Sequence, residues 1–488
     1  MKKIIYLILG ISLLYFLYLR FRLGLVRYFD VDEYTHLHWG YSFFLGQRPY
    51  VNFFYLIPPF FLYPIAGLFA VFGRSVGTII MARTFISGIY LATAGVIILL
   101  GRKLRNRQTG LLSALIFVLI PLPNDKMLEI RPDLLSVFLS LLGLYLLIKS
   151  FEKKRGWLLY ISGFFYSLSL GFVPKTLFFC IPVVLVFIYR LFRNFKKGVL
   201  RELVQFGAGF LLPVITILVL IVVWGKPKLA FYNMTKMASD VTATLGAKFY
   251  MRPDLFFYPN DTFYGLPGFS PPYVMNLLIY LIASFYAIFR FVSIFKDNDG
   301  EKSTREFLII SSFWINLYAF VYVYPLKHSQ YLIPVAPFIA IFFAEFISVL
   351  FLEKQKSTKG LLFLVFIIYL GFIGETLYKK KMQWTNKVSL TKLENLIKNI
   401  PKDSPIFDLT GETILFPDGY YFCCLPYGQY EESIRFKFPD LETDMKKRQT
   451  NFVHVGNVER LNVLPGLQAK YIRENFIPAS DSSFLVRK

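Results

Sequence analysis

The sequence has few charged residues and few of the side chains that do chemistry in most soluble enzymes. Only 17% of its 488 residues are charged, and it contains 4 histidines and 3 cysteines. A soluble chain of this length would need more charge to cover its surface, so a soluble globular class is disfavoured. Cys423 and Cys424 are adjacent and Cys180 lies in an apolar run, so we expect no disulfide framework.

Sequence patterns that mark several well-known chemistries are also absent. There is no glycine-rich phosphate-binding loop, no Cys–His spacing typical of a zinc site and no nucleophile elbow. The net charge is +23, but the basic residues form short clusters between apolar runs. Because no basic face with interleaved aromatic residues occurs, we expect no nucleic-acid partner.

What the sequence has in abundance is apolar residues, which make up 55% of the chain with a mean hydropathy of +0.51. This composition predicts an α-helical polytopic membrane protein. A basic start precedes the first apolar run, and no small-residue cleavage site follows it, so we expect an uncleaved helix. With that helix, about eleven spans are expected. They lie at 4–18, 77–100, 109–122, 133–149, 157–172, 175–192, 203–224, 273–295, 306–324, 330–352 and 360–378.

The distribution of lysine and arginine orients these spans. Alternate loops carry basic clusters, near 102–107, 153–155, 190–201, 290–305 and 354–359, whereas the loops between them carry few basic residues. The positive-inside rule assigns the basic loops to the cytoplasm. We therefore expect a multi-pass protein of the plasma (inner) membrane. Its first loop (20–76), its long loop (225–272) and its C-terminal part would then lie outside the cytoplasm.

The C-terminal part differs in character from the rest. It is charged and mixed, and it contains no spanning run. Helical spacing of apolar residues predicts a helix over 390–400, and short apolar segments at 406–409, 452–455 and 484–486 predict strands. We expect a transmembrane domain at 1–379 and a small extracytoplasmic α/β domain at 380–488, which is large enough for a modest core.

The segment from 28 to 59 is the main candidate for chemistry. Asp30, Asp32 and Glu33 stand together, and His36 follows one turn later. Apolar spacing after residue 34 predicts an amphipathic helix on the membrane surface, with Asp30 or Asp32 as its N-cap. Capping alone would explain these carboxylates, but carboxylates beside a membrane also mark polar cavities. His36 could be a ligand, a proton partner or an interface residue.

These residues also carry a resemblance to a known family. The segment DVDEYTHLHW at 30–39, followed by GQRPYVNFF at 46–54 and two prolines at 58–59, resembles the first extracytoplasmic loop of the GT-C glycosyltransferases. Glycosyltransferase family 39 and its relatives are the most similar group. That group includes dolichyl-phosphate-mannose-protein mannosyltransferases and lipid A aminoarabinose transferases. Further matches in the same order are EIRPD at 129–133, Lys175-Thr176 and QYLIP at 330–334, with Pro337-Phe338 after them.

The resemblance implies a glycosyltransferase that takes a hexosyl or pentosyl group from a polyprenyl-phosphate donor. The acceptor would be a lipid, glycan or protein outside the cytoplasm, as in lipopolysaccharide or glycan modification of the cell envelope. It implies that Asp32 is the catalytic base, with Asp30 and Glu33 beside it, because inverting transfer needs a carboxylate to take the acceptor proton. The leaving phosphate needs cations. The candidates are Arg83, Arg131, Lys175, Lys327 and His328.

Each of these cations also has a plainer explanation. Arg131 could form an ion pair with Glu129 or Asp133, and Lys175 and Lys327 could extend to the membrane interface. For the acceptor or sugar, the candidates are His36, Tyr55, Arg252 and Tyr331.

One departure from the family concerns the residues before the two prolines. Many relatives carry an acid and histidines there, whereas this chain has Tyr55, Leu56 and Ile57. A second carboxylate or a metal site at this position is therefore in doubt. We expect no obligatory cofactor and leave a divalent metal open. The alternative class is a transporter or flippase of a lipid-linked or anionic substrate. It is disfavoured because no inverted repeat is visible and the charges gather at the outer ends of the spans.

Overall fold

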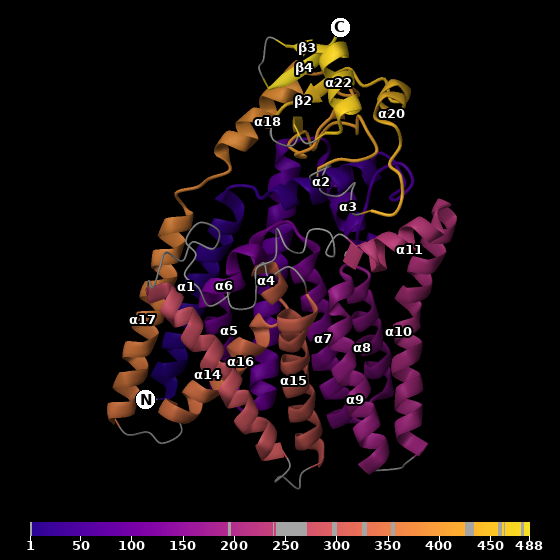
Figure 1. Cartoon of the computed structure of the whole chain (residues 1–488). Coiled ribbons are helices and arrows are strands. Elements are labelled where there is room, and N and C mark those ends of the chain that lie inside the picture. Colours follow the sequence, from indigo (N-terminus) through magenta and orange to yellow (C-terminus); the bar gives the residue numbers. More distant parts are fainter. Residues whose placement is uncertain are drawn as a thin grey trace.

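The chain folds into a helical bundle with a small sheet above one end (Figure 1). In this computed structural model, residues 2–193, 197–237, 239–240, 271–294, 300–324, 329–352, 357–424, 434–456, 461–462, 464–479 and 483–488 are described. The N-terminus lies at the end of the bundle away from the sheet, and the C-terminus lies beside the sheet. Arg252, Lys327 and His328, which the sequence marks as candidate site residues, lie outside the described residues.

The elements of the bundle follow one another in this order: α1 (Lys2–Val26), α2 (Val31–Phe44), η1 (Pro59–Phe61), α3 (Leu62–Phe72), α4 (Val76–Leu104), α5 (Arg107–Leu119), α6 (Pro121–Asn124), η2 (Asp125–Leu128), α7 (Pro132–Lys153), α8 (Gly156–Leu170), η3 (Pro174–Thr176), α9 (Leu177–Arg193), α10 (Lys197–Trp224), α11 (Pro227–Thr235), α14 (Pro271–Ile294), α15 (Gly300–Tyr318), η5 (Ala319–Val323), η6 (Ser329–Leu332), α16 (Ala336–Ile347), η7 (Ser348–Leu352) and α17 (Ser357–Lys381).

The elements of the C-terminal part are α18 (Lys387–Asn399), β1 (Ile406–Phe407), α20 (Leu441–Lys447), β2 (Phe452–His454), α22 (Gly466–Asn475), β3 (Phe476–Pro478) and β4 (Phe484–Arg487). They form a sheet in the order β1-β2-β4-β3. β1 pairs parallel with β2, and the other neighbours are antiparallel. The helix and three strands expected from the sequence are therefore present, and the sequence missed β3.

The membrane spans expected from hydropathy each coincide with a helix. Within the described part of the chain, 8 helices are long and apolar enough to cross a membrane, or up to 9 if the bent pair of 107–119 and 121–128 is one span. Shorter apolar helices at 156–170 and 336–351 account for the two remaining expected spans. The α-helical polytopic membrane fold is thus confirmed.

Helix α2 lies between the bundle and the C-terminal part (Figure 1). Leu37 and Tyr41 pack on one side, where Gly40 lets α3 approach so closely that a Cβ there would be 2.2 Å from Ile65 Cγ2. Thr35, His38 and other residues of the opposite side are also buried. The expected helix is therefore present, and the C-terminal part covers the face that would otherwise meet solvent. The place of α2 on the membrane surface stays a prediction.

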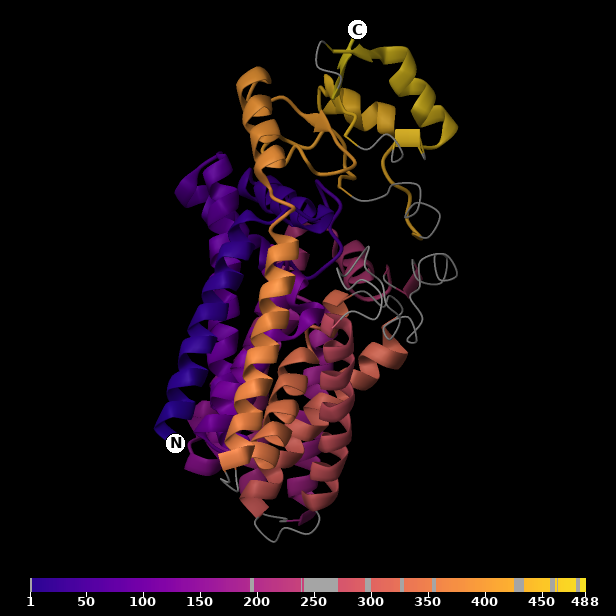
Figure 2. The same ribbon diagram turned by 90° about the vertical axis from the view of Figure 1, so that its left-hand side faces the viewer.

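The first and last long helices run side by side and are tied together where both end (Figure 2). The N–H of Tyr28 donates to the carbonyl of Trp384 over 3.1 Å, and the N–H of Asn386 donates to Val26 over 2.9 Å. The segment that carries the acidic residues therefore begins at a junction with the segment that leads into the C-terminal part.

Helices α8 and α10 approach each other at glycine. A Cβ on Gly209 would lie 1.9 Å from the carbonyl oxygen of Tyr160, and one on Gly163 would lie 2.0 Å from that of Phe206. Two residues before Gly209, a Cβ on Gly207 would meet nothing within 4 Å. Small residues at such crossings let helix backbones pack closely within a membrane.

We predict that Gly209→Val destabilises the bundle and that Gly207→Val does not. The first change drives a side chain into backbone, at a cost of about 1–3 kcal/mol in the free energy of unfolding. The second adds the same side chain to the same helix where space is open. Thermal unfolding of both variants in detergent measures the difference, and equal midpoints would contradict the described α8–α10 contact.

Candidate active site

The acidic residues form the beginning of α2. Asp30 is the N-cap, and its carboxylate accepts the N–H of Asp32 over 3.0 Å. The N–H of Asp30 donates in return to Glu33 Oε1 over 3.2 Å, which completes a capping box. The sequence left Asp30 and Asp32 open as the cap, and the structure selects Asp30. Asp32 therefore stands in the first turn with its carboxylate not engaged in capping.

Glu33 and Arg83 form an ion pair with no exposed side-chain surface. Arg83 Nη2 lies 2.7 Å from Glu33 Oε1, and Arg83 Nε lies 3.1 Å from Oε2. The same carboxylate accepts the N–H of Ile130 over 3.1 Å. Arg83 also donates to backbone carbonyls at the end of α1 and just after it, those of Gly24, Arg27 and Tyr28.

This environment bears on two roles expected from the sequence. Arg83 has its guanidinium N–H groups bonded within the protein, so it holds α1, α2 and α4 together, and contact with a donor phosphate would require some of these bonds to break. Glu33 is completely enclosed and bonded to Arg83 and to two backbone N–H groups, so it cannot take a proton from an acceptor without breaking those bonds.

Asp32 is the most exposed of the clustered carboxylates, with 39% of its side chain accessible. It forms an ion pair with Arg131 Nη1. Arg131 also bonds Asp133, with Nε 3.2 Å from Oδ2, and Asp133 in turn pairs with Lys175. The structure thus brings three of the sequence candidates into one chain of alternating charges. The plainer explanation of Arg131, an ion pair with Glu129 or Asp133, is also met.

Asp30 belongs to a second branch of the same network. Lys126 Nζ lies 2.7 Å from Asp30 Oδ2 and 2.9 Å from Glu129 Oε1, and Arg27 pairs with Glu129 over 2.9 Å. Burial opposes ionisation of Asp30, but Lys126 and Arg131 outweigh it and hold the pKa of that carboxyl well below its usual range. The structure therefore places Asp30 in the helix cap and in an ion pair with Lys126.

His36 faces aromatic rings rather than a ligand set. Its ring meets Trp39 and Phe61 edge-on, at centroid distances of 5.6 and 5.5 Å. Burial, with Arg131 adding to it, lowers the pKa of His36 to about 4. The imidazole is therefore neutral at ordinary pH, and of the roles left open by the sequence, that of a packed aromatic-like residue fits best.

The two tyrosine candidates differ in position. Tyr55 is fully buried, with its hydroxyl donating to the carbonyl of Pro58 over 3.2 Å and its ring against Trp39. Tyr331 lies at the charged network, with its ring centroid 4.9 Å from Lys175 Nζ. The structure therefore brings Tyr331 to the site and gives Tyr55 a packing role in place of the sugar contact expected for it.

Reasoning from the sequence missed Lys126, Glu129 and Asp133 as members of the site. Lys126 was visible as one of the few cations outside the basic loops, and the other two flank Arg131 within EIRPD. The sequence analysis also gave no role to His38, whose Nε2 lies 2.5 Å from Asp418 Oδ1. Nothing in local spacing could have indicated that contact, because the partners are 380 positions apart.

The acidic residues do not fit a divalent metal in this arrangement. Asp30, Asp32 and Glu33 are each paired with a protein cation, so their charge is already compensated. In the described part of the chain, the group of donors close enough to share an ion is His38 with Cys423 and Cys424, whose sulfurs are bonded to each other.

Comparison with known proteins identifies the architecture. A family model described as dolichyl-phosphate-mannose-protein mannosyltransferase matches residues 57–224. The structure of the oligosaccharyltransferase AglB from Archaeoglobus fulgidus, in complex with an inhibitory peptide and a dolichol-phosphate, superposes with a TM-score of 0.59. That match has 10% identity and covers 98% of this chain and 74% of the other. ArnT from Cupriavidus metallidurans, bound to undecaprenyl phosphate, superposes with a TM-score of 0.57. That match has 12% identity and covers 99% of this chain and 97% of the other.

The chain has the GT-C fold. The resemblance inferred from the acidic motif and the later segments is therefore confirmed at the level of the superfamily. A search of curated protein sequences finds no significant match. At these identities the likeness of the solved structures establishes the fold alone, so the chemistry of this GT-C protein has to be argued from its own residues.

We predict that Arg83→Leu destabilises the protein and that adding Glu33→Leu restores part of the loss. Removing one partner of a buried ion pair leaves an uncompensated charge, at a cost of about 3–5 kcal/mol. The double variant has no such charge. Chemical unfolding in detergent compares the three proteins. Unchanged stability of Arg83→Leu, together with weaker donor binding, would return Arg83 to the phosphate site.

We predict a pH dependence of stability that comes from His36. Its folded pKa of about 4 lies below its ordinary value of 6.5, so the unfolded chain binds a proton that the folded chain does not. The stability is present above pH 6.5 and falls as the pH drops toward 4. His36→Phe should remove about 1–2 kcal/mol of this loss at pH 5. Unfolding midpoints from pH 7 to 5 measure it, and parallel curves would contradict it.

Proposed function

We propose that this protein is an inverting glycosyltransferase that uses a polyprenyl-phosphate-linked sugar, with Asp32 as its catalytic base. The observation that carries the proposal is that the three clustered carboxylates differ in burial and in bonding partners. Glu33 is enclosed and bound by Arg83, and Asp30 caps the helix and pairs with Lys126. Asp32 pairs with Arg131, but it takes no part in capping the helix and 39% of its side chain is exposed. It can therefore meet an acceptor hydroxyl or amine.

In this reaction the carboxylate of Asp32 takes the acceptor proton while the acceptor oxygen or nitrogen attacks the anomeric carbon. The bond from that carbon to the phosphate oxygen breaks, and the polyprenyl phosphate leaves with the electron pair. Cations must meet the charge that develops on the phosphate. Arg131 and Lys175, each 9% exposed, are the candidates among the described residues. Tyr331 beside Lys175 offers a ring on which a sugar could stack.

The donor class is supported by the fold and by its relatives. AglB and ArnT were each solved with a polyprenyl phosphate, a dolichol-phosphate and an undecaprenyl phosphate respectively. The matched family model is also named for a dolichyl-phosphate-linked sugar. For the acceptor we keep the classes that the sequence suggested, a lipid, a glycan or a protein, and for the transferred group a hexose or pentose.

We also propose that the site faces the outside of the cytoplasmic membrane. The ends of α9, α10, α14 and α15 that carry basic clusters lie away from the C-terminal part (Figure 1). The positive-inside rule favours the cytoplasm for that end. The acidic site lies toward the other end, together with the C-terminal part. On this basis 1–379 forms the catalytic membrane domain and 380–488 an extracytoplasmic domain.

We predict that Asp32→Asn lowers transfer by at least about 100-fold, the lower range for loss of a general base, without impairing folding. The control is Asp440→Asn, which makes the same change at an exposed N-cap in the C-terminal part. Mass spectrometry of lipids and glycans from cells carrying each variant measures the product. Normal product from Asp32→Asn would remove Asp32 as the base, and absence of any product difference when the gene is deleted would remove the proposed function.

A further inference from the structure

One face of α2 is held by a loop of the C-terminal part. Thr35 Oγ1 donates to the carbonyl of Cys424 over 3.1 Å. One turn on, His38 Nε2 lies 2.5 Å from Asp418 Oδ1, and a further turn on, Ser42 donates to Asp418 Oδ2 over 2.6 Å. His38 and Asp418 are both 1% exposed. The loop therefore contacts α2 along its length, on the helix that begins with the proposed base.

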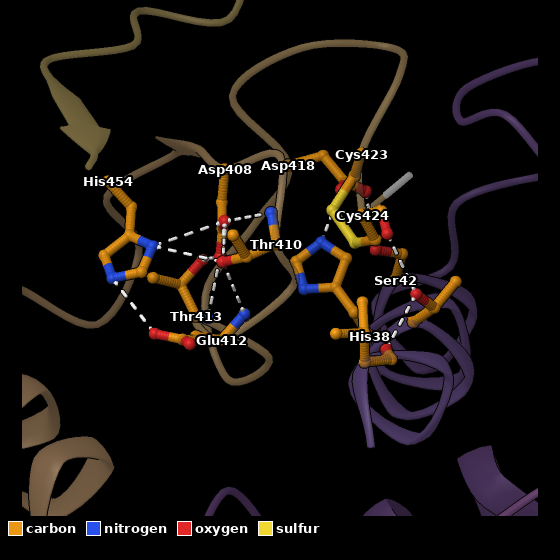
Figure 3. The surroundings of a disulfide bond; sticks show 12 residues. His38, Ser42, Asp408, Thr410, Glu412, Thr413, Asp418, Cys423, Cys424 and His454 are labelled. Carbon is orange, nitrogen blue, oxygen red and sulfur yellow. Dashed lines mark hydrogen bonds and ion pairs between the residues drawn. A yellow bond between two sulfur atoms is a disulfide. The ribbon is translucent and has the colours of Figure 1, made fainter. Parts of the chain in front are cut away.

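The same loop contains a disulfide between neighbouring residues. Cys423 and Cys424 are bonded to each other and both are buried, in a chain for which the sequence predicted no disulfide framework. Figure 3 shows the disulfide beside the ring of His38 and close to Asp418. A ring nitrogen of His38 and both sulfurs lie within 4.8 Å of one another. The disulfide thus lies at the contact between the loop and α2.

This disulfide is poorly suited to stabilise the fold as a staple. A cross-link stabilises mainly by restricting the unfolded chain, and the effect grows with the length of the loop that it closes. The bonded residues here are adjacent in the sequence, so the closed loop is the shortest that a chain can form. Stabilisation by loop closure therefore does not explain why the two cysteines are bonded.

The surroundings favour the reduced pair electrostatically and oppose it sterically. Burial opposes the charge on His38, but Asp418 outweighs it and raises the pKa of the imidazole, and a cation beside sulfur stabilises a thiolate. Against this, the turn at Gly411 (φ +80°) packs on the disulfide, because a Cβ there would lie 3.1 Å from Cys424 Sγ and 3.2 Å from Tyr34 Cβ. Two separate thiols need more room than a bonded pair, and both cysteines are buried beside this turn.

We propose that Cys423–Cys424 is a redox-active disulfide, and that its reduction releases the C-terminal loop from α2 by breaking the His38–Asp418 contact. The oxidised pair keeps the loop on α2 and Asp32 in place. The reduced pair expands, and the loop with Asp418 moves away. The structural step stands on the contacts above, and only its effect on glycosyl transfer rests on the proposed function.

The co-reactant is a dithiol, such as a protein with two neighbouring cysteines. A thiolate of the dithiol attacks the sulfur of Cys423, because that residue is 5% exposed and Cys424 is 0% exposed, and the sulfur of Cys424 leaves as a thiolate. The second thiol of the co-reactant then attacks its own sulfur in the mixed disulfide and releases Cys423. Two electrons and two protons pass to the cysteines, and the co-reactant becomes a disulfide.

The test uses the full-length protein in detergent, reduced with dithiothreitol and then reoxidised. Alkylation followed by mass spectrometry reports the state of Cys423 and Cys424, and hydrogen exchange reports the stability of α2. We expect both thiols to be labelled and α2 to exchange at least about 100-fold faster, the lower end of what the loss of a buried ion pair produces. Reoxidation should restore slow exchange. Helix α5, whose main contacts lie within the bundle, should exchange at an unchanged rate.

Two variants sharpen the experiment. Cys423→Ser/Cys424→Ser should show fast exchange of α2 without reductant and no response to it. Cys180→Ser removes the remaining cysteine, which lies in α9 and is not bonded to another, and should respond as the unchanged protein does. If the double variant fails to fold, the reversible cycle of the unchanged protein still decides the proposal.

Three results would overturn the proposal. These are labelled thiols with unchanged exchange of α2, a pair that resists reduction until the protein unfolds, and a native protein whose cysteines are free and hold a zinc ion with His38. If α2 loosens reversibly but neither state transfers a sugar, the redox site stands and the proposed function falls. If reduction loosens α2 and lowers transfer together, both are supported.

Discussion

The arrangement of the candidate site depends on the buried ion pair of Glu33 and Arg83. Taking both charges out of water is costly, and the cost is met only because further bonds satisfy each group: the N–H of Ile130 on the carboxylate, and carbonyls at the end of α1 on the guanidinium. One pair therefore fixes α1, α2, α4 and the segment before α7 relative to one another. The position of Asp32 depends on the same pair, because Asp32 is the neighbour of Glu33 in the first turn of α2 and has little conformational freedom once that turn is held.

The remaining charges share partners rather than forming isolated pairs. Arg131 serves both Asp32 and Asp133, and Lys175 serves Asp133 and lies against the ring of Tyr331. An anionic group that enters such a network competes with a carboxylate for a cation that is already oriented, so it does not need to organise the cation itself. For the proposed reaction this means that phosphate binding at Arg131 would weaken its hold on Asp32 when the acceptor arrives.

Hydropathy, capping rules and motif order predicted the parts of the molecule that depend on neighbouring residues. The spans, an N-cap at Asp30 or Asp32, the C-terminal helix and three of the strands are of this kind. What the sequence could not predict are contacts between distant segments. Arg83 has the outward position expected of a phosphate ligand, and only the fold reveals that its partner is Glu33, 50 positions earlier. The burial of α2 was missed for the same reason, since its cover comes from residues near Asp418.

The tie between α1 and α17 has a consequence for the order in which the protein can be completed. Tyr28 and Val26 emerge early in synthesis, but the residues that hydrogen-bond to them, Trp384 and Asn386, are made more than three hundred positions later. At a synthesis rate of about 5–20 residues per second, the acidic segment waits roughly 20–70 seconds for them. During that time its carboxylates and the basic residues of α4 and η2 have already been synthesised. The acidic segment is therefore among the first parts to be made and among the last to reach its final form.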